Sequence, residues 1–253
     1  MCGFIGKVSY ENIHHESLEN CNKLIECRGP DSKNNSRGIS GNNENLYFDL
    51  IFNRLSILDL SDSASQPMTS KNFRTTLLFN GEIYNHKDLR KNLESKGINF
   101  ITSHSDTEVL LNGLSYYGEQ FLQKIRGQFA IVFLDLNKNK LLIARDRLGQ
   151  KPLFYKHDSK SLTFSSNLKS IVQNENCFDL DKNSLSSYLE LGVVPSPNTI
   201  FKNINKVAPG EVINIQFDKS NIEVHKSRYW EIEDYVGYEE FNDFDPAQLR
   251  WIE

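Results

Sequence analysis

The chain has 253 residues, 38% of them hydrophobic and 25% charged, which is the composition of a soluble globular protein with room for a full core. A formal net charge of −4 excludes the basic excess expected of proteins that bind nucleic acids or anionic membranes. No stretch approaches 18 apolar residues and no apolar leader follows Met1, so we expect neither a transmembrane helix nor a signal peptide. Four irregularly spaced cysteines and the lack of CxxC and HExxH motifs favour a reduced, cytoplasmic setting and no metal site.

The first part of the chain is rich in predicted strands. Alternating residues at 3–8 predict the first of them, and 75–79 predict another that ends at Asn80-Gly81, a common turn dipeptide. Residues 46–60 are apolar but interrupted at Asn53-Arg54, which predicts strand, turn and strand.

Two helices are predicted next. Leu89 and Leu93 lie one turn apart in a helix over 86–96, which ends before Gly97. The second helix begins at the capping-box pattern Ser105-Asp106-Thr107-Glu108, and Gly118 closes it.

Hairpins dominate the rest of the chain. They are predicted over 129–144, 153–165 and 212–225, with a short helix at 184–191 between the last two. Consecutive hairpins favour antiparallel sheets, and grouped helices favour layers that cover those sheets. The acidic, aperiodic segment 231–253 is interpreted as a tail or the start of a linker.

Cys2 is the first candidate for chemistry because removal of Met1 would leave a thiol and a free α-amine on one residue. A thiol ionises near pH 8.5 and an α-amine near pH 8, so the amine can act as general base for its own thiol without a catalytic histidine. The alternative is that cysteine stands second by chance.

Asn80 and Gly81 are candidates for stabilising an oxyanion. Attack of a nucleophile such as the Cys2 thiol on a carbonyl group passes through a negatively charged tetrahedral intermediate, which needs donors where the charge develops. Asn80 offers a side-chain NH₂ group, and Gly81 offers a backbone N–H that no Cβ obstructs. The alternative is a simple turn.

Five ordered segments, together with Cys2, resemble the N-terminal glutaminase domain of glutamine-hydrolysing asparagine synthetases. That domain is a class II glutamine amidotransferase of the N-terminal nucleophile hydrolase type, and the similarity runs from Cys2 to about Trp230. The segments are Arg28-Gly29-Pro30-Asp31, Asn53-Arg54-Leu55-Ser56-Ile57-Leu58-Asp59, Phe79-Asn80-Gly81-Glu82-Ile83-Tyr84-Asn85, Ser105-Asp106-Thr107-Glu108 and Ala144-Arg145-Asp146-Arg147-Leu148-Gly149-Gln150-Lys151-Pro152-Leu153.

The resemblance implies an α+β fold, a four-layer αββα sandwich of two mainly antiparallel sheets, over residues 2–230. It implies that Cys2 is the nucleophile and that Asn80 and Gly81 form the oxyanion hole. Arg54 would grip the α-carboxylate of glutamine bidentately and Asp106 would hold its α-ammonium. The implied glutamine-binding residues are Arg54, Leu55, Ile57, Asn80, Gly81, Glu82 and Asp106.

Each of these roles has a plainer alternative. Arg54 could form a surface ion pair, and Asp106 could be an acidic first-turn residue favoured by the helix dipole. The Arg28-Gly29-Pro30-Asp31 loop is interpreted as structural. Two positions depart from the family pattern: Cys27 replaces the usual histidine and is expected to be a small buried residue, and Asn167 replaces a usual glutamate.

The Ser-Gly-Gly-x-Asp-Ser loop, with which asparagine synthetases bind ATP, does not occur in the sequence. We therefore expect a fragment, a truncated product or half of a split enzyme, with no cofactor of its own and with ATP and Mg²⁺ belonging to a separate synthetase domain. Three hypotheses remain: a glutaminase acting through Cys2, an idle module that docks on a synthetase subunit, and a related hydrolase or amidotransferase that serves another acceptor.

Overall fold

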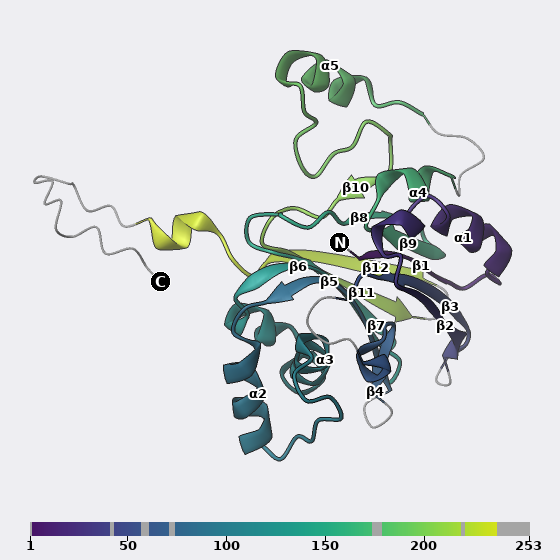
Figure 1. Ribbon diagram of the computed structural model, residues 1–253. Helices are drawn as coiled ribbons and strands as arrows, with labels where there is room; N and C mark the ends of the chain where they lie inside the picture. The colour runs from purple at the N-terminus through teal and green to yellow at the C-terminus, as the bar shows by residue number, and fades with distance from the viewer. Residues whose placement is uncertain are drawn as a thin grey trace, which may run out of the picture.

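The computed structural model describes residues 2–40, 43–56, 61–70, 74–173, 179–218 and 221–236. Two six-stranded sheets pack face to face, with helices on their outer sides (Figure 1). Every strand pairing among the described residues is antiparallel. The predicted α+β sandwich of two antiparallel sheets is confirmed.

The first sheet has the strand order β10-β8-β9-β1-β3-β2 and the second has the order β12-β11-β7-β6-β5-β4. The strands of the first sheet are β1 (Gly3–Ser9), β2 (Ser32–Ser40), β3 (Asn43–Arg54), β8 (Phe154–His157), β9 (Ser161–Ser165) and β10 (Asn205–Lys206). The strands of the second sheet are β4 (Met68–Ser70), β5 (Thr75–Ile83), β6 (Gly127–Asp135), β7 (Lys140–Arg145), β11 (Glu211–Asp218) and β12 (Asn221–Arg228).

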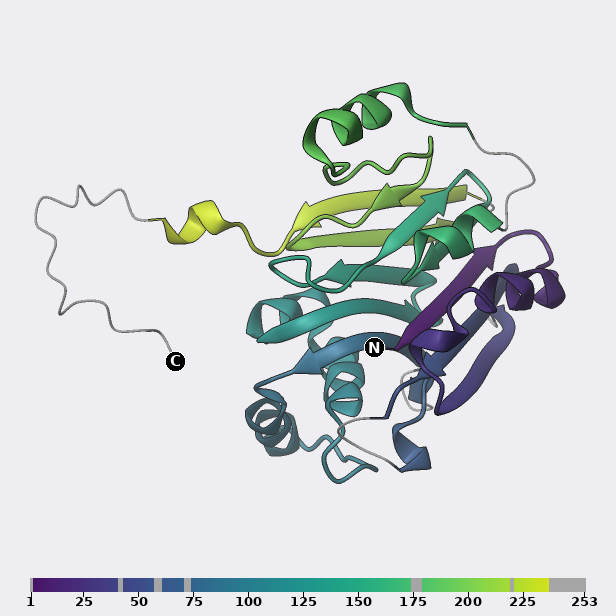
Figure 2. The same cartoon turned by 45° about the horizontal axis from the view of Figure 1, so that its top comes forward.

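The helices lie on opposite sides of this pair of sheets. In the turned view of Figure 2, α1 lies on one side and α2 and α3 lie on the other. The helices are α1 (His15–Asn22), α2 (His86–Ser95), α3 (Asp106–Tyr117), α4 (Leu168–Gln173) and α5 (Lys182–Leu191), and the 3₁₀ turns are η1 (Glu26–Arg28), η2 (Asp62–Ala64), η3 (Gly118–Lys124) and η4 (Ile232–Tyr235). In the part of the chain described above, no helix is long and apolar enough to cross a membrane.

Both faces of each sheet bury apolar side chains, because successive residues of a strand point to opposite faces. On β1, Phe4 enters the core between the sheets, whereas Ile5 packs with Leu18 under α1. On β5, Leu78 faces the core between the sheets, and its neighbour Phe79 packs in the cluster under α2 and α3. The two-sided burial explains the continuous apolar runs in these strands.

Most local predictions are confirmed. The hairpins β6–β7, β8–β9 and β11–β12 form as expected, and α2, α3 and α5 occupy the predicted helical segments. Gly97 and Gly118 follow α2 and α3 with φ of 83° and 61°, which explains why glycine ends these helices. The separation of a tail at 231–253 stays a prediction, because residues 237–253 lie outside the described ranges.

Two strand predictions are wrong. Asn80-Gly81 is not a turn, because β5 continues through it to Ile83 in unbroken pairing with β6. The turn predicted at Asn53-Arg54 is wrong, because both residues belong to β3, which runs from Asn43 to Arg54. Residues 57–60, which belong to the predicted second strand, lie outside the described residues.

Two side-chain predictions are also wrong. Ser105 occupies the N-cap of α3 but makes no capping hydrogen bond, and the Glu108 carboxylate instead accepts from the backbone of Ile101 and Thr102 at 2.7 Å each. Cys27 is exposed rather than buried, because it lies in the short turn η1 and not on a covered face.

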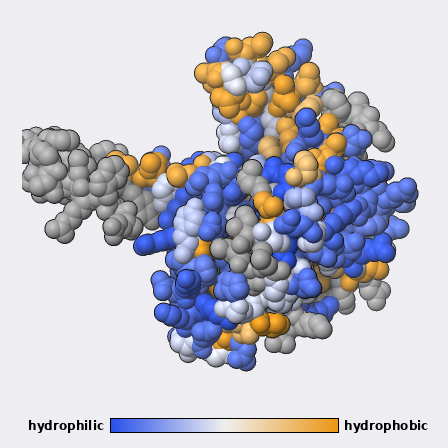
Figure 3. Space-filling model, viewed as in Figure 1, coloured by the Kyte–Doolittle hydropathy of each residue, from blue (hydrophilic) through white to orange (hydrophobic). Residues whose placement is uncertain are grey.

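The helix α5 and the loop after it stand away from the two sheets, and apolar atoms gather on this part of the surface (Figure 3). The exposed apolar side chains here are Tyr188, Leu189, Leu191 and Val193.

The loop after β7 is held by two adjacent side chains. Asp146 is fully buried, and its carboxylate accepts from the backbone N–H groups of Phe129, Leu148, Gln150 and Lys151 at 2.9–3.2 Å. The Arg145 guanidinium donates to the carbonyl groups of Lys151, Val207 and Gly149. Asp146 therefore binds backbone N–H groups of the loop, and Arg145 binds its backbone carbonyl groups.

We expect Asp146→Asn to lower the free energy of unfolding by about 2–4 kcal/mol, because an NH₂ group would then face buried backbone donors. Asp158 is a matched control, since it also accepts backbone N–H groups in a turn but is exposed. Asp158→Asn should cost less than about 1 kcal/mol. Urea denaturation of both variants measures the difference, and equal losses would contradict a special role for the buried carboxylate.

Candidate active site

A cavity of about 130 Å³ opens where β1, β3, β5 and α3 approach one another. It is smaller than the roughly 300–1,000 Å³ of pockets that take drug-sized ligands. Its lining residues are Cys2, Arg54, Leu55, Ser56, Ala64, Gln66, Phe79, Asn80, Gly81, Glu82, Ser105, Asp106, Thr107, Gln128 and Lys151.

The pairing of β1 determines where Cys2 lies. Gly3 pairs with Asn53 of β3, and Phe4 on the other edge is bound through its N–H and C=O to Ser166 at 3.0 Å each. Because β1 is hydrogen-bonded on both edges, the residue immediately before it is held beside the end of β3, next to Arg54.

The Cys2 thiol is bound to the backbone of Leu55. The Leu55 N–H donates to Sγ at 3.3 Å, and Sγ lies 3.6 Å from the Leu55 carbonyl oxygen as a donor. Burial raises the pKa of the Cys2 thiol, although the Leu55 N–H and the positive charges of the chain terminus, Arg54 and Arg28 act in the opposite direction. The thiol form is therefore favoured until positive charge near the sulfur increases.

Arg54 is nearly buried at the end of β3, with 7% of its surface exposed, and its Nη1 donates to the Ser61 carbonyl oxygen at 3.0 Å. The neighbouring Asn53 side chain exchanges hydrogen bonds with Asn22 of α1, at 2.7 and 3.4 Å. The interpretation of Arg54 as part of a surface ion pair is therefore replaced by an arginine that lines a cavity.

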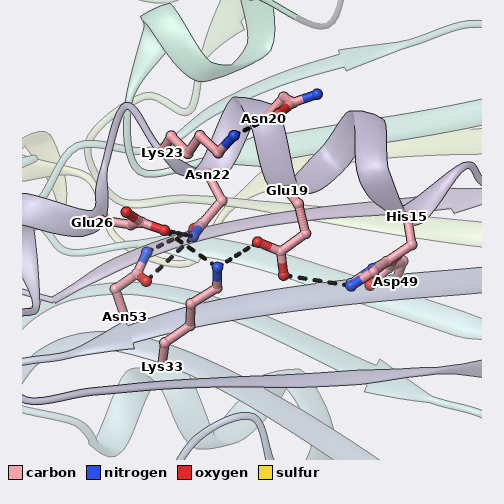
Figure 4. A network of polar contacts seen from close by, with 9 residues as sticks. All are labelled: His15, Glu19, Asn20, Asn22, Lys23, Glu26, Lys33, Asp49 and Asn53. Atoms are coloured by element: carbon pink, nitrogen blue, oxygen red, sulfur yellow. Dashed lines mark hydrogen bonds and ion pairs between the residues drawn. The ribbon is translucent and has the colours of Figure 1, made fainter.

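Polar contacts between α1 and the first sheet continue away from Asn53 (Figure 4). Lys33 of β2 pairs with Glu19 and Glu26, and His15 Nδ1 lies 2.6 Å from Asp49 Oδ2. Burial raises the pKa of the Asp49 carboxyl, and the contact with His15 opposes that rise. These contacts join α1 to β2 and β3 and support the strand end that carries Arg54.

The Arg28-Gly29-Pro30-Asp31 loop braces the same strand end. A Cβ on Gly29 would lie 2.1 Å from the Asn53 carbonyl oxygen, so only glycine allows this approach. The Asp31 carboxylate accepts from the Ser56 N–H at 2.7 Å, and the Arg28 Nε donates to the Cys2 carbonyl oxygen at 3.3 Å. The loop therefore holds the backbone on both sides of the thiol.

Asn80 points from β5 toward the first sheet, on the same face as Leu78. Its side chain is buried, and Nδ2 has no hydrogen-bond partner among the described residues. A buried amide donor without a partner costs about 1–3 kcal/mol, so this donor needs an acceptor that enters the cavity.

Gly81 places a second donor beside Asn80. Its partner Phe129 uses its own N–H for Asp146, so Gly81 and Phe129 form a non-hydrogen-bonded pair and the Gly81 N–H points away from β6. A Cβ on Gly81 would lie 2.0 Å from the Gln128 carbonyl oxygen, which explains the glycine. The Asn80 and Gly81 donors thus belong to adjacent residues that line one cavity.

Asp106 begins α3 at the other side of the cavity, and its Oδ2 accepts from the Ile83 N–H at 3.1 Å. Burial raises the pKa of the Asp106 carboxyl, while the Ile83 hydrogen bond and the charge of His86 act against the rise. The buried carboxylate is therefore costly in its ionised form without a cationic partner. The N-terminus of α3 stabilises its negative charge in part.

All but one of the residues singled out in the sequence as site residues line this cavity. Leu55 contributes its backbone to the thiol, and Glu82 lies at the half-buried rim. Ile57 lies outside the described residues. Cys27 is absent from the lining, and Asn167 accepts from the Lys169 N–H at 2.9 Å at the start of α4.

Several residues of the lining were not predicted from the sequence, among them Gln66, Thr107, Gln128 and Lys151. Lys151 could have been found from its place in the Arg145–Leu153 segment, but no local signal marks Gln66 as part of a site. Within the described ranges, no cluster of three His, Cys, Asp or Glu side chains is placed to bind a metal ion.

Comparison with known proteins gives the family. Residues 1–230 match the family of the glutamine amidotransferase domain. Asparagine synthetase [glutamine-hydrolyzing] 1 of Bacillus subtilis is 36% identical over 223 residues, which are 86% of this chain and 34% of that protein. The putative asparagine synthetase [glutamine-hydrolyzing] 2 of Methanocaldococcus jannaschii is 33% identical, over 93% of this chain and 47% of that protein. This chain therefore spans between a third and a half of the length of these relatives.

A solved structure shares the fold. The glutamine phosphoribosylpyrophosphate amidotransferase of Bacillus subtilis superposes with a TM-score of 0.61 at 17% identity, over 89% of this chain and 49% of that one. The match over residues 1–230 shows that the chain belongs to the glutamine amidotransferase domain family, and its sequence is similar to the corresponding part of asparagine synthetases.

Proposed function

We propose that the chain hydrolyses glutamine to glutamate and ammonia, with Cys2 as the nucleophile. The observation that carries this proposal is the convergence in one small cavity of a thiol, a buried unpaired amide donor and two opposite charges. Arg54 would bind the α-carboxylate of glutamine and Asp106 its α-ammonium. These two charges favour a free amino acid over a glutamine residue within a peptide.

The reaction begins once Met1 has been removed. The α-amine of Cys2 takes the thiol proton, and the thiolate attacks the side-chain amide carbon of glutamine. The negative oxygen that forms is bound by Asn80 Nδ2 and the Gly81 N–H. The protonated amine then gives its proton to the leaving nitrogen, which departs as ammonia and leaves a thioester, and water activated by the same amine releases glutamate.

The raised pKa of the Cys2 thiol fits the requirement that Met1 be removed before the reaction, because it disfavours the thiolate while Met1 is still in place. The terminal ammonium already lowers the pKa of the thiol from one residue away. After removal of Met1 the charge would lie on Cys2 itself, and the shorter distance strengthens its effect. The proposed reaction calls for no cofactor in this chain, and ATP and Mg²⁺ would belong to a synthetase activity.

The ammonia acceptor and the partner are also proposals. The matched relatives are asparagine synthetases that are two to three times as long as the match, so we propose a synthetase domain or subunit as the user of the ammonia. The exposed apolar side chains of α5 favour contact with such a partner. The same observation is what supports the alternative of an idle docking module.

Cys2→Ala should abolish glutamine hydrolysis and leave the unfolding transition in place. The direct measurement is intact mass before and after treatment with an electrophilic glutamine analogue, which reports Met1 removal and capture of the thiol together. Ammonia release by a chain that retains Met1, or by the Cys2→Ala variant, would overturn the mechanism. A processed wild-type chain that is captured but releases no ammonia would favour the docking module.

Arg54→Ala should raise KM for glutamine by about tenfold or more, because the carboxylate loses a charge-assisted, bidentate partner. Arg37→Ala is the control, since Arg37 is exposed on β2 and does not line the cavity. Steady-state kinetics of both variants give the comparison. An unchanged KM in Arg54→Ala contradicts the assigned role.

Asp106→Asn should weaken glutamine binding while stabilising the empty protein at neutral pH. The folded-state pKa of Asp106 lies above its ordinary value of 3.8, so its carboxylate lowers stability above that folded pKa. The gain in the free energy of unfolding from Asp106→Asn should shrink as the pH falls through the raised pKa toward 3.8. In that range the Asp106 carboxyl of the folded wild type becomes neutral, as the amide of the variant is at every pH. Urea unfolding at a series of pH values tests the sign, and a variant less stable at neutral pH contradicts it.

A further inference from the structure

The edge of β5 that faces the cavity is closed by side chains instead of a full neighbouring strand. β4 pairs only with Thr75, Thr76 and Leu77. Beyond that point, the Phe79 N–H donates to Gln66 Oε1 at 2.6 Å and the Ile83 N–H donates to Asp106 Oδ2 at 3.1 Å. Alternate residues of a strand direct their N–H groups to the same edge, so the Gly81 N–H lies between these two.

Gln66 takes the place of a strand residue at this edge. The register that pairs Met68 with Leu77 would, if continued, bring Gln66 opposite Phe79. The side-chain amide of Gln66 makes the contacts that a backbone amide would make there, because Oε1 accepts from the Phe79 N–H and Nε2 donates to the Phe79 carbonyl oxygen at 3.0 Å. The Gln66 side chain thus continues the hydrogen bonding between β4 and β5 as far as Phe79, and this hydrogen bonding ends before Gly81.

The same amide reaches the start of α3. Nε2 lies 3.5 Å from Thr107 Oγ1, and Thr107 follows Asp106. Gln66 has 6% of its surface exposed and lines the cavity. One buried side chain therefore contacts the backbone that precedes Asn80 and the helix turn that carries Asp106.

We propose that Gln66 is a positioning residue for the oxyanion site, which it sets by fixing the main chain of Phe79 and by leaving the Gly81 N–H without a strand partner. The inference rests on the proposed hydrolysis of glutamine. Gln66 acts through Asn80 and Gly81 and does not touch the reacting atoms.

The contribution of Gln66 should be larger in the transition state than in substrate binding. Arg54 and Asp106 hold the two ends of the amino acid, whereas the donors of Asn80 and Gly81 act on charge that appears only during the reaction. A shift of about 1 Å in such donors can cost about a hundredfold in rate. Loss of Gln66 should therefore lower kcat and change KM little.

The first test is Gln66→Met, which keeps the length of the side chain and removes its hydrogen bonds. We expect kcat for glutamine to fall about 10- to 100-fold with KM within about threefold. Alkylation of Cys2 by iodoacetamide should stay within about twofold of wild type, because this reaction forms no oxyanion in the cavity.

The matched control is Thr75→Val. The Thr75 hydroxyl joins the other end of β5 to Ser115 of α3 at 2.9 Å, so this variant also removes a partly buried contact between the same strand and helix. Thr75 does not line the cavity. Thr75→Val should lower stability without lowering kcat.

The second test is Gln66→Glu followed across pH. When protonated, the introduced carboxyl group can accept from the Phe79 N–H and donate to the Phe79 carbonyl oxygen, as the amide does. When ionised, it presents only acceptors to that carbonyl oxygen. The ratio of kcat in this variant to kcat in the wild type should rise as the pH falls. The other ionisable groups around the cavity are the same in both proteins, so most of their effect on kcat cancels from the ratio. These groups are Cys2, Arg54, Glu82, His86, Asp106 and Lys151.

The outcomes separate the two proposals. If the processed wild type releases no ammonia from glutamine, the proposed function fails. If the wild type is active and Gln66→Met keeps its kcat, or loses no more kcat than Thr75→Val, the role of Gln66 is wrong. If Gln66→Met does not fold, the pH dependence of Gln66→Glu decides, and a ratio that is flat with pH rejects the proposal.

Discussion

The geometry of the cavity depends on the pairing of β1 between β3 and β9. Because both edges of β1 are hydrogen-bonded, Cys2, which directly precedes it, is held next to the first paired residue of a central strand. The same pairing brings the thiol to the end of β3, where Arg54 and Leu55 lie. The facing sheet supplies Asn80, so the packing of one sheet on the other also sets the distance between the Cys2 thiol and the Asn80 amide.

Several groups in the cavity are held in states that cost stability. The Asn80 amide is buried without a partner among the described residues, and burial raises the pKa of the Asp106 carboxyl, so its ionised form is costly. A bound amino acid would compensate each of these costs at once, because it brings an acceptor and an ammonium group. The extensive apolar core between the sheets and under α2 and α3 offsets the cost in the empty protein.

The sequence predicted the parts of the fold that are governed by local rules. Hairpins and glycine-ended helices depend on neighbouring residues, and β6–β7, β8–β9 and α2 formed where expected. The edge strand β2 was missed because Ser32–Ser40 is polar, and it forms through backbone pairing with β3. Asn80-Gly81 was assigned to a turn because the dipeptide favours one locally, whereas pairing with β6 keeps it extended.

The site residues show the same difference between local signals and contacts made across the fold. Cys2, Arg54, Asn80 and Asp106 were found because they stand in recognisable segments, and the structure brings them into one cavity. Gln66 carries no such signal, because its importance arises only when β4 ends and its amide meets Phe79 across the sheet. The exposure of Cys27 was likewise invisible, since it depends on the turn η1 and not on residue type.

In the loop after β7, the side chains that hold the backbone differ from those that face outward. The side chains of Asp146 and Arg145 bind main-chain atoms of this loop and of its neighbours, and in doing so they fix the backbone of Lys151 at the cavity. The outward side chain of Leu148, which is 69% exposed, takes no part in that scaffold. Evolution or an engineer can therefore exchange residues at this outer position to suit a different neighbour while the inner wall of the cavity keeps its form.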